Sequence, residues 1–456
     1  MAVDVGDRDE VATTLAGPTP RTLGFLDQGA FWVNLGVSLL GFSGAATVLS
    51  PSGGQPLPLV AAVLAAVVGT AVGSLMLGLS AVPGARTQQP SMVLMRGLFG
   101  ARASWLPTAL NVLQLVGWGT FELIAITQGA QAVLGGGPRW LYVLVLGVLT
   151  TAMTMRPLGA VRVLRRYVTV AVAIALVYLF AQVLRAPLPD LTSGSWDGFA
   201  AGADAALAVA ISFIPVASDY SRHSRSTGAA FTAATLGYAV AQSLCYLLGL
   251  LVLVESGNAD QPYQPFLAVP LGAVFFGVLV LREIDQSFAD TYSTGVSLQN
   301  LLPNTDRRLL TLAVGALTTV LALALDMDQY SSFLSLIGSV FVPMFGVLTA
   351  DYFGRRGGPR WDFSDRAPTR WRMLLAWLAG LAIYQLINPG EVAGWSDAWQ
   401  RAAAALHFAP ASWMSASLFS FVGAAVLAWL LGLLPDRART SADGDQSAEE
   451  VTKSRG

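Results

Sequence analysis

The sequence predicts an all-α membrane protein with about twelve transmembrane helices. Hydrophobic residues make up 54% of its 456 residues and charged residues only 12%, whereas about a quarter of the residues of a soluble domain are charged. Apolar runs of about 20 residues, the length a helix needs to cross the hydrocarbon core, recur along nearly the whole chain. Arginines gather after every second run, as expected when a chain crosses a bilayer back and forth.

Each apolar run is expected to form one span, with an error of a few residues at its ends. In chain order the runs are 28–50, 57–80, 106–132, 138–155, 166–185, 198–219, 230–254, 268–300, 309–325, 330–352, 370–388 and 411–434.

The charges of the short loops predict the orientation of the chain. The basic clusters are Arg86, Arg96 and Arg102; Arg156, Arg162, Arg165 and Arg166; Arg222 and Arg225; Arg307 and Arg308; and Arg355, Arg356 and Arg360. The other loops are acidic or neutral, so both termini are expected in the cytoplasm, with the chain a multi-pass protein of the plasma or inner membrane. Because the clusters lie at membrane edges, we interpret them as topology signals and expect no nucleic-acid partner.

The two ends of the chain are polar. Residues 1–26 lack the apolar core of a signal peptide and are expected to form a cytoplasmic tail. Residues 435–456 contain almost no apolar side chain and are expected to be disordered. The single cysteine, Cys245, excludes an internal disulfide.

Two spans contain helix-breaking residues at corresponding places. The first contains Gly36, Gly41 and Gly44, and the sixth, five spans later, contains Pro215. Such breaks in the first helix of each half are typical of secondary transporters built from inverted repeats, although glycine and proline are also common in ordinary membrane helices. No residue-level repeat links the halves.

The third span carries a polar stripe. Asn111, Gln114, Trp118 and Glu122 follow at spacings that place them on one helix face. An indole beside amide and carboxylate groups suits a flat ring with hydrogen-bonding edges. The alternative is that the polar groups tie helices together and the indole packs in the core.

The eighth span carries an unusual density of charge. Arg282 is expected to pair with Asp285, while Glu283, Gln286 and Asp290 lie on one face. Charges in a membrane helix must face protein or water and are costly without a task. We expect a coupling-cation site or a proton relay, with a structural ion-pair network as the alternative.

Three stretches resemble the nucleobase:cation symporter family, which includes cytosine permeases, hydantoin transporters, and purine, uracil and allantoin permeases. They are "GARTQQPSMVLMRGLFGARASWLPTALNVLQLVGW", "PVASDYSRHSR" and "TYSTGVSLQNLLP". The resemblance covers about residues 22–355 and implies the leucine-transporter-type fold of two inverted five-helix repeats with broken helices 1 and 6. The implied core is 27–355, with repeats at about 27–190 and 196–355, followed by a cytoplasmic loop and peripheral helices 11 and 12 over 356–434.

The resemblance also implies a substrate site. The stacking tryptophan of the family falls on Trp118, and the glutamine of hydantoin-type members falls on Glu122. Gln114 lies within a residue of a cytosine-contacting glutamine. The second aromatic of the family falls on Ala210, so Phe213 is expected to replace it. The remaining expected substrate-binding residues, next to the two breaks or on the eighth span, are Ser212, Gly41, Phe42 and Asp290.

A coupling site is implied as well. The sodium ion of the family is bound by main-chain oxygens of the broken first helix, here near Gly36 and Leu40, and by hydroxyls that fall on Ile284, Asp285 or Gln286. An aspartate there could hold sodium or carry a proton itself, so the expected coupling residues are Asp285, Gly36, Leu40, Glu283 and Gln286, with Na⁺ or H⁺ as the ion.

These observations predict a symporter that imports cytosine, a purine base or a related heterocycle by alternating access. A thiamine- or pyridoxine-like vitamin, allantoin or a hydantoin is the alternative substrate, and a non-transporting receptor or scaffold is the alternative class. The sequence has no phosphate loop, cysteine pair or other catalytic motif. We therefore expect neither an enzyme nor an ATP-driven pump, no cofactor beyond the coupling ion, the lipid bilayer and a nucleobase-like molecule as partners, and a monomer.

Overall fold

The computed structural model describes residues 13–15, 17, 19–51, 55–154, 167–185, 190–256, 263–327, 330–354 and 361–434. In these parts the regular structure is helical, apart from an isolated bridge between Leu23 and Ser224. The predicted C-terminal tail and most of the predicted N-terminal tail lie outside the described residues.

The predicted spans are helical. In chain order the helices are α1 (Phe25–Gly36), α2 (Leu39–Leu49), α3 (Leu59–Thr87), α4 (Ser91–Phe99), α5 (Trp105–Leu134), α6 (Arg139–Met153), α8 (Thr169–Val183), α9 (Phe199–Ile211), η3 (Ile214–Val216), α10 (Ala217–Ser221), α11 (Thr227–Thr232), η4 (Ala233–Gly237), α12 (Tyr238–Ser256), α13 (Gln264–Ala268), α14 (Gly272–Leu298), α15 (Arg307–Ala324), α16 (Tyr330–Tyr352), α17 (Trp371–Ile387), α18 (Trp395–Ala405) and α19 (Ala416–Leu433). The short helices α4, α13 and α18 were not predicted.

Length and apolar composition mark the longer helices as membrane spans. Within the described residues, seven helices are long and apolar enough to cross a membrane, or eight if the bent pair α1 and α2 counts as one span. The other predicted spans correspond to three shorter apolar helices, α6, α8 and α17, and to the charged helix α14.

The first span is broken between Gly36 and Leu39. Helices α1 and α2 meet at an angle of 45°, because Val37 and Ser38 have extended backbone conformations between them. The Ser38 hydroxyl accepts a hydrogen bond from the Leu40 N–H at 3.1 Å and so caps the start of α2. The predicted break is therefore present.

The sixth span is broken at Pro215. Helix α9 ends at Ile211, and a 3₁₀ turn over Ile214–Val216 leads into α10. Proline has no N–H to donate within a helix, so it favours a break here.

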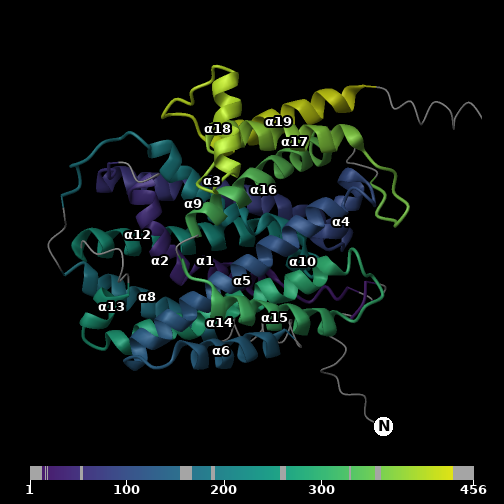
Figure 1. Cartoon of the computed structure of the whole chain (residues 1–456). Coiled ribbons are helices and arrows are strands. Elements are labelled where there is room, and N and C mark those ends of the chain that lie inside the picture. The colour runs from purple at the N-terminus through teal and green to yellow at the C-terminus, as the bar shows by residue number, and fades with distance from the viewer. Residues whose placement is uncertain are drawn as a thin grey trace, which may run out of the picture.

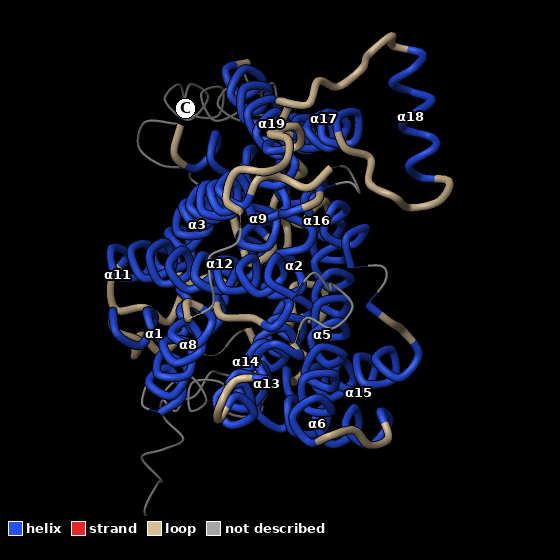
Figure 2. Tube along the Cα trace, turned by 90° about the vertical axis from the view of Figure 1, so that its left-hand side faces the viewer, coloured by secondary structure: helices blue, strands red, loops and turns tan. Residues whose placement is uncertain are grey.

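The broken first span packs against two long helices, α5 and α14, which contact each other. Helix α5 packs along α14, α2 contacts both α5 and α14, and α3 packs along α9. Helices α17 and α19 pack against each other and α16, and lie at the opposite edge of the molecule from α6 and α15 (Figures 1 and 2). Residues of the two breaks, of α5 and of α14 thus meet inside the protein.

Candidate substrate and coupling site

The break in the first span is held by Glu283 of α14. One oxygen of its carboxylate, Oε1, accepts a hydrogen bond from the Ser38 hydroxyl at 2.7 Å, and the other, Oε2, accepts one from the Leu39 N–H at 3.1 Å. The carboxylate therefore lies at the N-terminal end of α2, where the helix dipole favours negative charge.

The neighbouring Arg282 binds the other side of the break. Its guanidinium donates to Glu283 Oε2 at 2.7 Å, to Gln286 Oε1 at 2.7 Å and to the Asn34 carbonyl in the last turn of α1. The side chains of Arg282 and Glu283 are 0% and 1% exposed. Asp285 was predicted as the partner of Arg282, and among the side chains that the structure describes Arg282 forms an ion pair with Glu283. The Asp285 side chain lies outside the described residues.

Helix α5 presents its predicted polar stripe to the interior. Gln114 Nε2 donates to the Ser212 carbonyl and to Asn111 Oδ1, both at 3.0 Å. Asn111 in turn donates to the Ser297 hydroxyl of α14 at 2.9 Å. Gln114 therefore binds the backbone at the break of the sixth span, and Asn111 joins α5 to α14. Both contacts agree with the structural role that sequence analysis kept as an alternative.

Trp118 lies in an aromatic cluster that sequence analysis missed. The centre of its ring system is 5.4 Å from that of Phe333 and 5.8 Å from that of Tyr330, both on α16 and both edge-to-face. Phe121 completes the cluster at 5.2 Å from Phe333. The aromatic residues at positions 330 and 333 are three apart on the tenth span, and that spacing was the signal available in the sequence.

Several buried polar atoms around Trp118 have no hydrogen-bond partner within the described part of the chain. They are Gln114 Oε1, Trp118 Nε1, Glu122 Oε2, Asp290 Oδ2 and the Tyr330 hydroxyl. Asp290 faces α5, since a side chain added at Gly119 would lie 3.8 Å from its Cβ. Buried polar atoms in proteins almost always have a partner, so this cluster has the donors and acceptors to receive a polar ligand.

Phe213, the expected second stacking residue, contacts other aromatic rings. Its ring centre lies 5.3 Å from that of Tyr238 and 6.4 Å from that of Trp32. It belongs to a different apolar cluster from Trp118. Its place beside a substrate remains a prediction.

The other predicted residues lie at the breaks. Phe42 packs on Phe266 at 5.1 Å, and the Ser212 hydroxyl donates to the Val209 carbonyl. A Cβ at Gly36 would lie 2.7 Å from Ala241 Cβ, so this glycine permits close approach of α1 to α12. Gly41 faces Cys245 of α12, and Leu40 is buried. Their predicted binding roles remain predictions.

Two of the stretches that carried the family resemblance meet in the structure. The Asp219 carboxylate accepts a hydrogen bond from the Ser91 N–H at 2.9 Å, and the Ser91 hydroxyl accepts one from the Ser218 N–H at 3.0 Å. These bonds join the start of α4 to α10, directly after the break of the sixth span.

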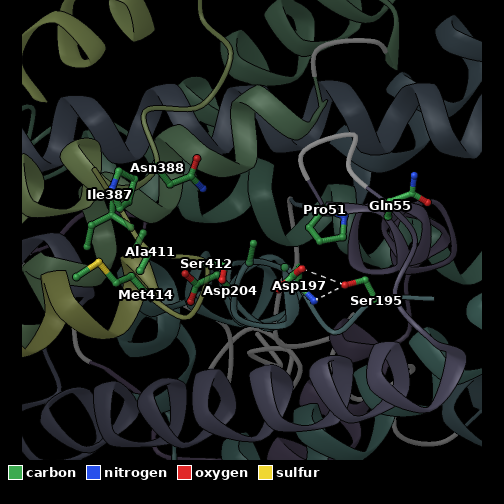
Figure 3. A pocket seen from close by; sticks show the side chains of 14 residues that line it. Pro51, Gln55, Ser195, Asp197, Asp204, Ile387, Asn388, Ala411, Ser412 and Met414 are labelled. Carbon is green, nitrogen blue, oxygen red and sulfur yellow. Dashed lines mark hydrogen bonds between the residues drawn. The ribbon is translucent and has the colours of Figure 1, made fainter. Parts of the chain in front are cut away.

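A cavity of about 430 Å³ lies away from this cluster (Figure 3). Pro51 and Gln55, Ser195 and Asp197, and residues next to α17 and α19 line it. The Asp204 carboxylate at its wall accepts hydrogen bonds from the Ser415 hydroxyl at 2.6 Å and the Ser417 N–H at 3.3 Å. The residues predicted to bind substrate or cation are not among its lining residues, so this cavity is separate from the predicted site.

Comparison with known proteins assigns the chain to a family. Residues 19–388 match the family model described as permease for cytosine/purines, uracil, thiamine and allantoin. No curated protein matches the chain. The match confirms the family predicted from the three sequence stretches and, because this family consists of permeases, the prediction of a transporter and not an enzyme.

Solved structures confirm the fold class. Mhp1, a nucleobase-cation-symport-1 family transporter solved in a closed conformation with bromovinylhydantoin bound, is 17% identical, with 91% of this chain and 92% of that chain covered and a TM-score of 0.72. The inward-facing conformation of Mhp1 is 16% identical, with 92% and 94% covered and a TM-score of 0.67. A Na⁺-coupled sialic acid symporter in a substrate-bound outward-open state is 12% identical, with 93% of both chains covered and a TM-score of 0.62. The family match extends over most of the sequence, and the chain belongs to the permeases for cytosine and purines, uracil, thiamine and allantoin.

Proposed function

We propose that this permease imports a nucleobase or a related flat heterocycle across the cell membrane, by alternating access and coupled to a cation gradient. The observation that carries the proposal is the group of unpartnered polar atoms beside the Trp118 indole. A planar ring with polar edges can pack on the indole while its edge groups bond to these atoms. The bromovinylhydantoin bound to the structurally similar Mhp1 is such a ring.

The acidic side chains of the cluster favour a substrate rich in N–H donors. The unpartnered oxygens of Glu122 and Asp290 accept hydrogen bonds when ionised, and a protonated carboxyl group donates only one. Cytosine and adenine carry an exocyclic amino group next to ring nitrogens and can supply several donors. A cationic vitamin-like heterocycle of the thiamine or pyridoxine type is the second candidate, because the same two carboxylates could balance its charge.

Uptake into proteoliposomes tests the proposal. The panel is radiolabelled cytosine, adenine, hypoxanthine, uracil, allantoin, a hydantoin, thiamine and pyridoxine, each with an inward cation gradient. We expect concentrative uptake of at least one amino-substituted base, competed by the others in proportion to their affinity. Preferential uptake of thiamine or pyridoxine would support the second candidate. Binding of a panel member without uptake would indicate a receptor, and neither binding nor uptake of any member would refute the proposal.

The control variant is Gln182→Ala. Gln182 lies on α8, its side chain accepts a hydrogen bond from the exposed Arg185, and it is remote in sequence from the residues of the cluster. Its uptake should match that of the wild type, which separates effects of the cluster from general effects of substitution in a span.

A further inference from the structure

The broken first span leaves two unlike helix ends close together. The last turn of α1 exposes carbonyl groups and carries partial negative charge, and the first turn of α2 exposes N–H groups and carries partial positive charge. In transporters with broken helices, carbonyls at the end of such a half-helix bind the coupling cation. A positive charge is therefore needed beside the end of α1.

Adjacent residues of α14 match both ends. Arg282 places its guanidinium on the Asn34 carbonyl at the end of α1, and Glu283 places its carboxylate on the Leu39 N–H and the Ser38 hydroxyl at the start of α2. The two side chains also pair with each other at 2.7 Å. The Arg282 guanidinium thus lies at the C-terminal end of α1, which carries partial negative charge, and the Glu283 carboxylate lies at the N-terminal end of α2, which carries partial positive charge.

The position of the guanidinium is fixed from several sides. Asn34 holds its place in α1 through its amide, which donates to the Ala30 carbonyl at 2.7 Å and to the Thr169 hydroxyl of α8 at 2.6 Å. Gln286, one turn along α14, accepts from the guanidinium. Because both charged side chains are almost fully buried, water screens this arrangement little.

We propose that the Arg282 guanidinium is a tethered cation that takes the place of a metal ion at the break of the first span, so that transport by this chain does not depend on sodium. The inference rests on the proposed function and specifies its ion, because protons then remain as the coupling cation. A sodium ion at the Asn34 carbonyl would have to displace the guanidinium or lie beside it, where two like charges repel strongly in the low-dielectric interior.

Thermal unfolding of the purified full chain tests this without a substrate. A cation that binds the folded state and not the unfolded chain raises the melting temperature, and the stabilisation grows with the logarithm of its concentration once that exceeds the Kd. We compare equal concentrations of sodium chloride and choline chloride. The wild type should show no sodium-specific shift. Arg282→Ala leaves the Glu283 carboxylate and the Asn34 carbonyl facing a space without the guanidinium, and this variant should gain a sodium-specific upward shift and a similar shift with millimolar guanidinium chloride.

Two further variants keep the test decisive. Arg307→Ala removes another buried arginine, one that donates to the Thr154 carbonyl, and should lower the melting temperature without creating a sodium response. If Arg282→Ala does not fold, the double variant Arg282→Gln with Glu283→Gln removes both charges and avoids an unpaired buried carboxylate. This double variant should fold and remain insensitive to sodium, because the carboxylate that would bind the ion is gone.

Transport gives the second readout. With the panel member that is taken up best, the initial rate of uptake by the wild type should be equal in sodium and choline at the same proton gradient and membrane potential. In choline, Arg282→Ala should lose about tenfold or more in apparent affinity, and sodium should restore part of the loss. A sodium-specific shift of the melting temperature or sodium-dependent uptake in the wild type would overturn the inference. A folded Arg282→Ala whose melting temperature responds to neither sodium nor guanidinium would also overturn it. Failure of every panel member would refute the proposed function but would leave the unfolding test intact.

Discussion

His223 offers a test of the structure that needs no knowledge of the substrate. It lies in the turn between α10 and α11, where its ring is 1% exposed. Arg222 Nε donates to His223 Nε2 at 3.2 Å, so this nitrogen is unprotonated and the proton is on Nδ1, which donates to the Pro20 carbonyl at 2.9 Å. Burial, and then the positive charge of Arg222, lower the pKa of His223 from 6.5 to about 3, with a smaller contribution from Arg307.

The sign of the pH dependence follows from this shift. The unfolded chain takes up a proton at His223 below about pH 6.5, whereas the folded protein resists it until about pH 3. The neutral imidazole therefore contributes stability that is fully present above about pH 6.5 and is lost as the pH falls toward about 3. Between pH 7 and pH 5 the loss is about 2 kcal/mol, from about 1.4 kcal/mol for each pH unit below the unfolded pKa.

The chain contains only two histidines, which gives a matched control. His223→Asn retains a donor near the position of Nδ1 but cannot titrate. His407→Asn is the control, because it changes the other histidine, which is exposed. Unfolding of the detergent-purified protein by heat and by denaturant, at pH 7 and pH 5, measures the difference. We expect the wild type and His407→Asn to lose about 2 kcal/mol more than His223→Asn on acidification. The same pH dependence in all three proteins would refute the buried neutral histidine.

Three further predictions concern the site and its frame. Trp118→Ala should weaken equilibrium binding of the best panel substrate about tenfold or more, since stacking on a base contributes about 1 to 3 kcal/mol. In the same binding assay Phe333→Ala should change the affinity less, whereas in unfolding experiments it should lower the stability. Glu122→Gln should change the order of affinities within the panel, because it replaces an acceptor oxygen with a donor. A substrate that no longer matches this group should bind less tightly by about 1 to 3 kcal/mol. An equal loss of uptake for all substrates, with binding retained, would instead assign Glu122 to coupling. Asp351→Asn should cost about 3 kcal/mol in unfolding experiments, since the buried carboxylate accepts two bonds from Arg370, whereas Asp326→Asn, in the exposed pair with Arg139, should cost at most about 1 kcal/mol.

Much of the fold could be predicted from the sequence because a membrane restricts the choices. Apolar runs of the required length become helices, since backbone groups in hydrocarbon must bond within the segment. Pro215 predicted a break because proline lacks the N–H that a helix needs, and the break lies there. The short helices α4, α13 and α18 were missed because each is too short to span the membrane, and apolar runs of spanning length were the pattern from which the helices were predicted.

The residues of the site could be predicted from the sequence, whereas the residues that they contact across the fold could not. Buried charge and amide groups on α5 and α14 are visible in a sequence because they interrupt apolar runs. The partner of Arg282 was predicted by the local spacing of three residues, yet its acceptors include a carbonyl 248 positions away, which local spacing cannot reveal. Tyr330 and Phe333 were missed for a related reason: aromatic residues in a membrane helix are ordinary, and only the fold brings these two against Trp118.

The contacts of α5 and α14 connect the two breaks through one structural unit. The first break is bound to α14 by Arg282 and Glu283, and the sixth-span break is bound to α5 by Gln114. Because α5 and α14 pack along each other, both breaks are attached to the same pair of helices. Asp290 lies seven residues after Glu283, or about 10 Å along α14 at 1.5 Å per residue, and faces α5 one residue from Trp118. A rotation of the broken helices relative to this pair would therefore stretch the bonds at both breaks and change the surroundings of Trp118, where the substrate site is predicted. A substrate that bonds to the unpartnered atoms of the cluster can bias the equilibrium between two arrangements of these helices only as far as it binds one of them more strongly than the other.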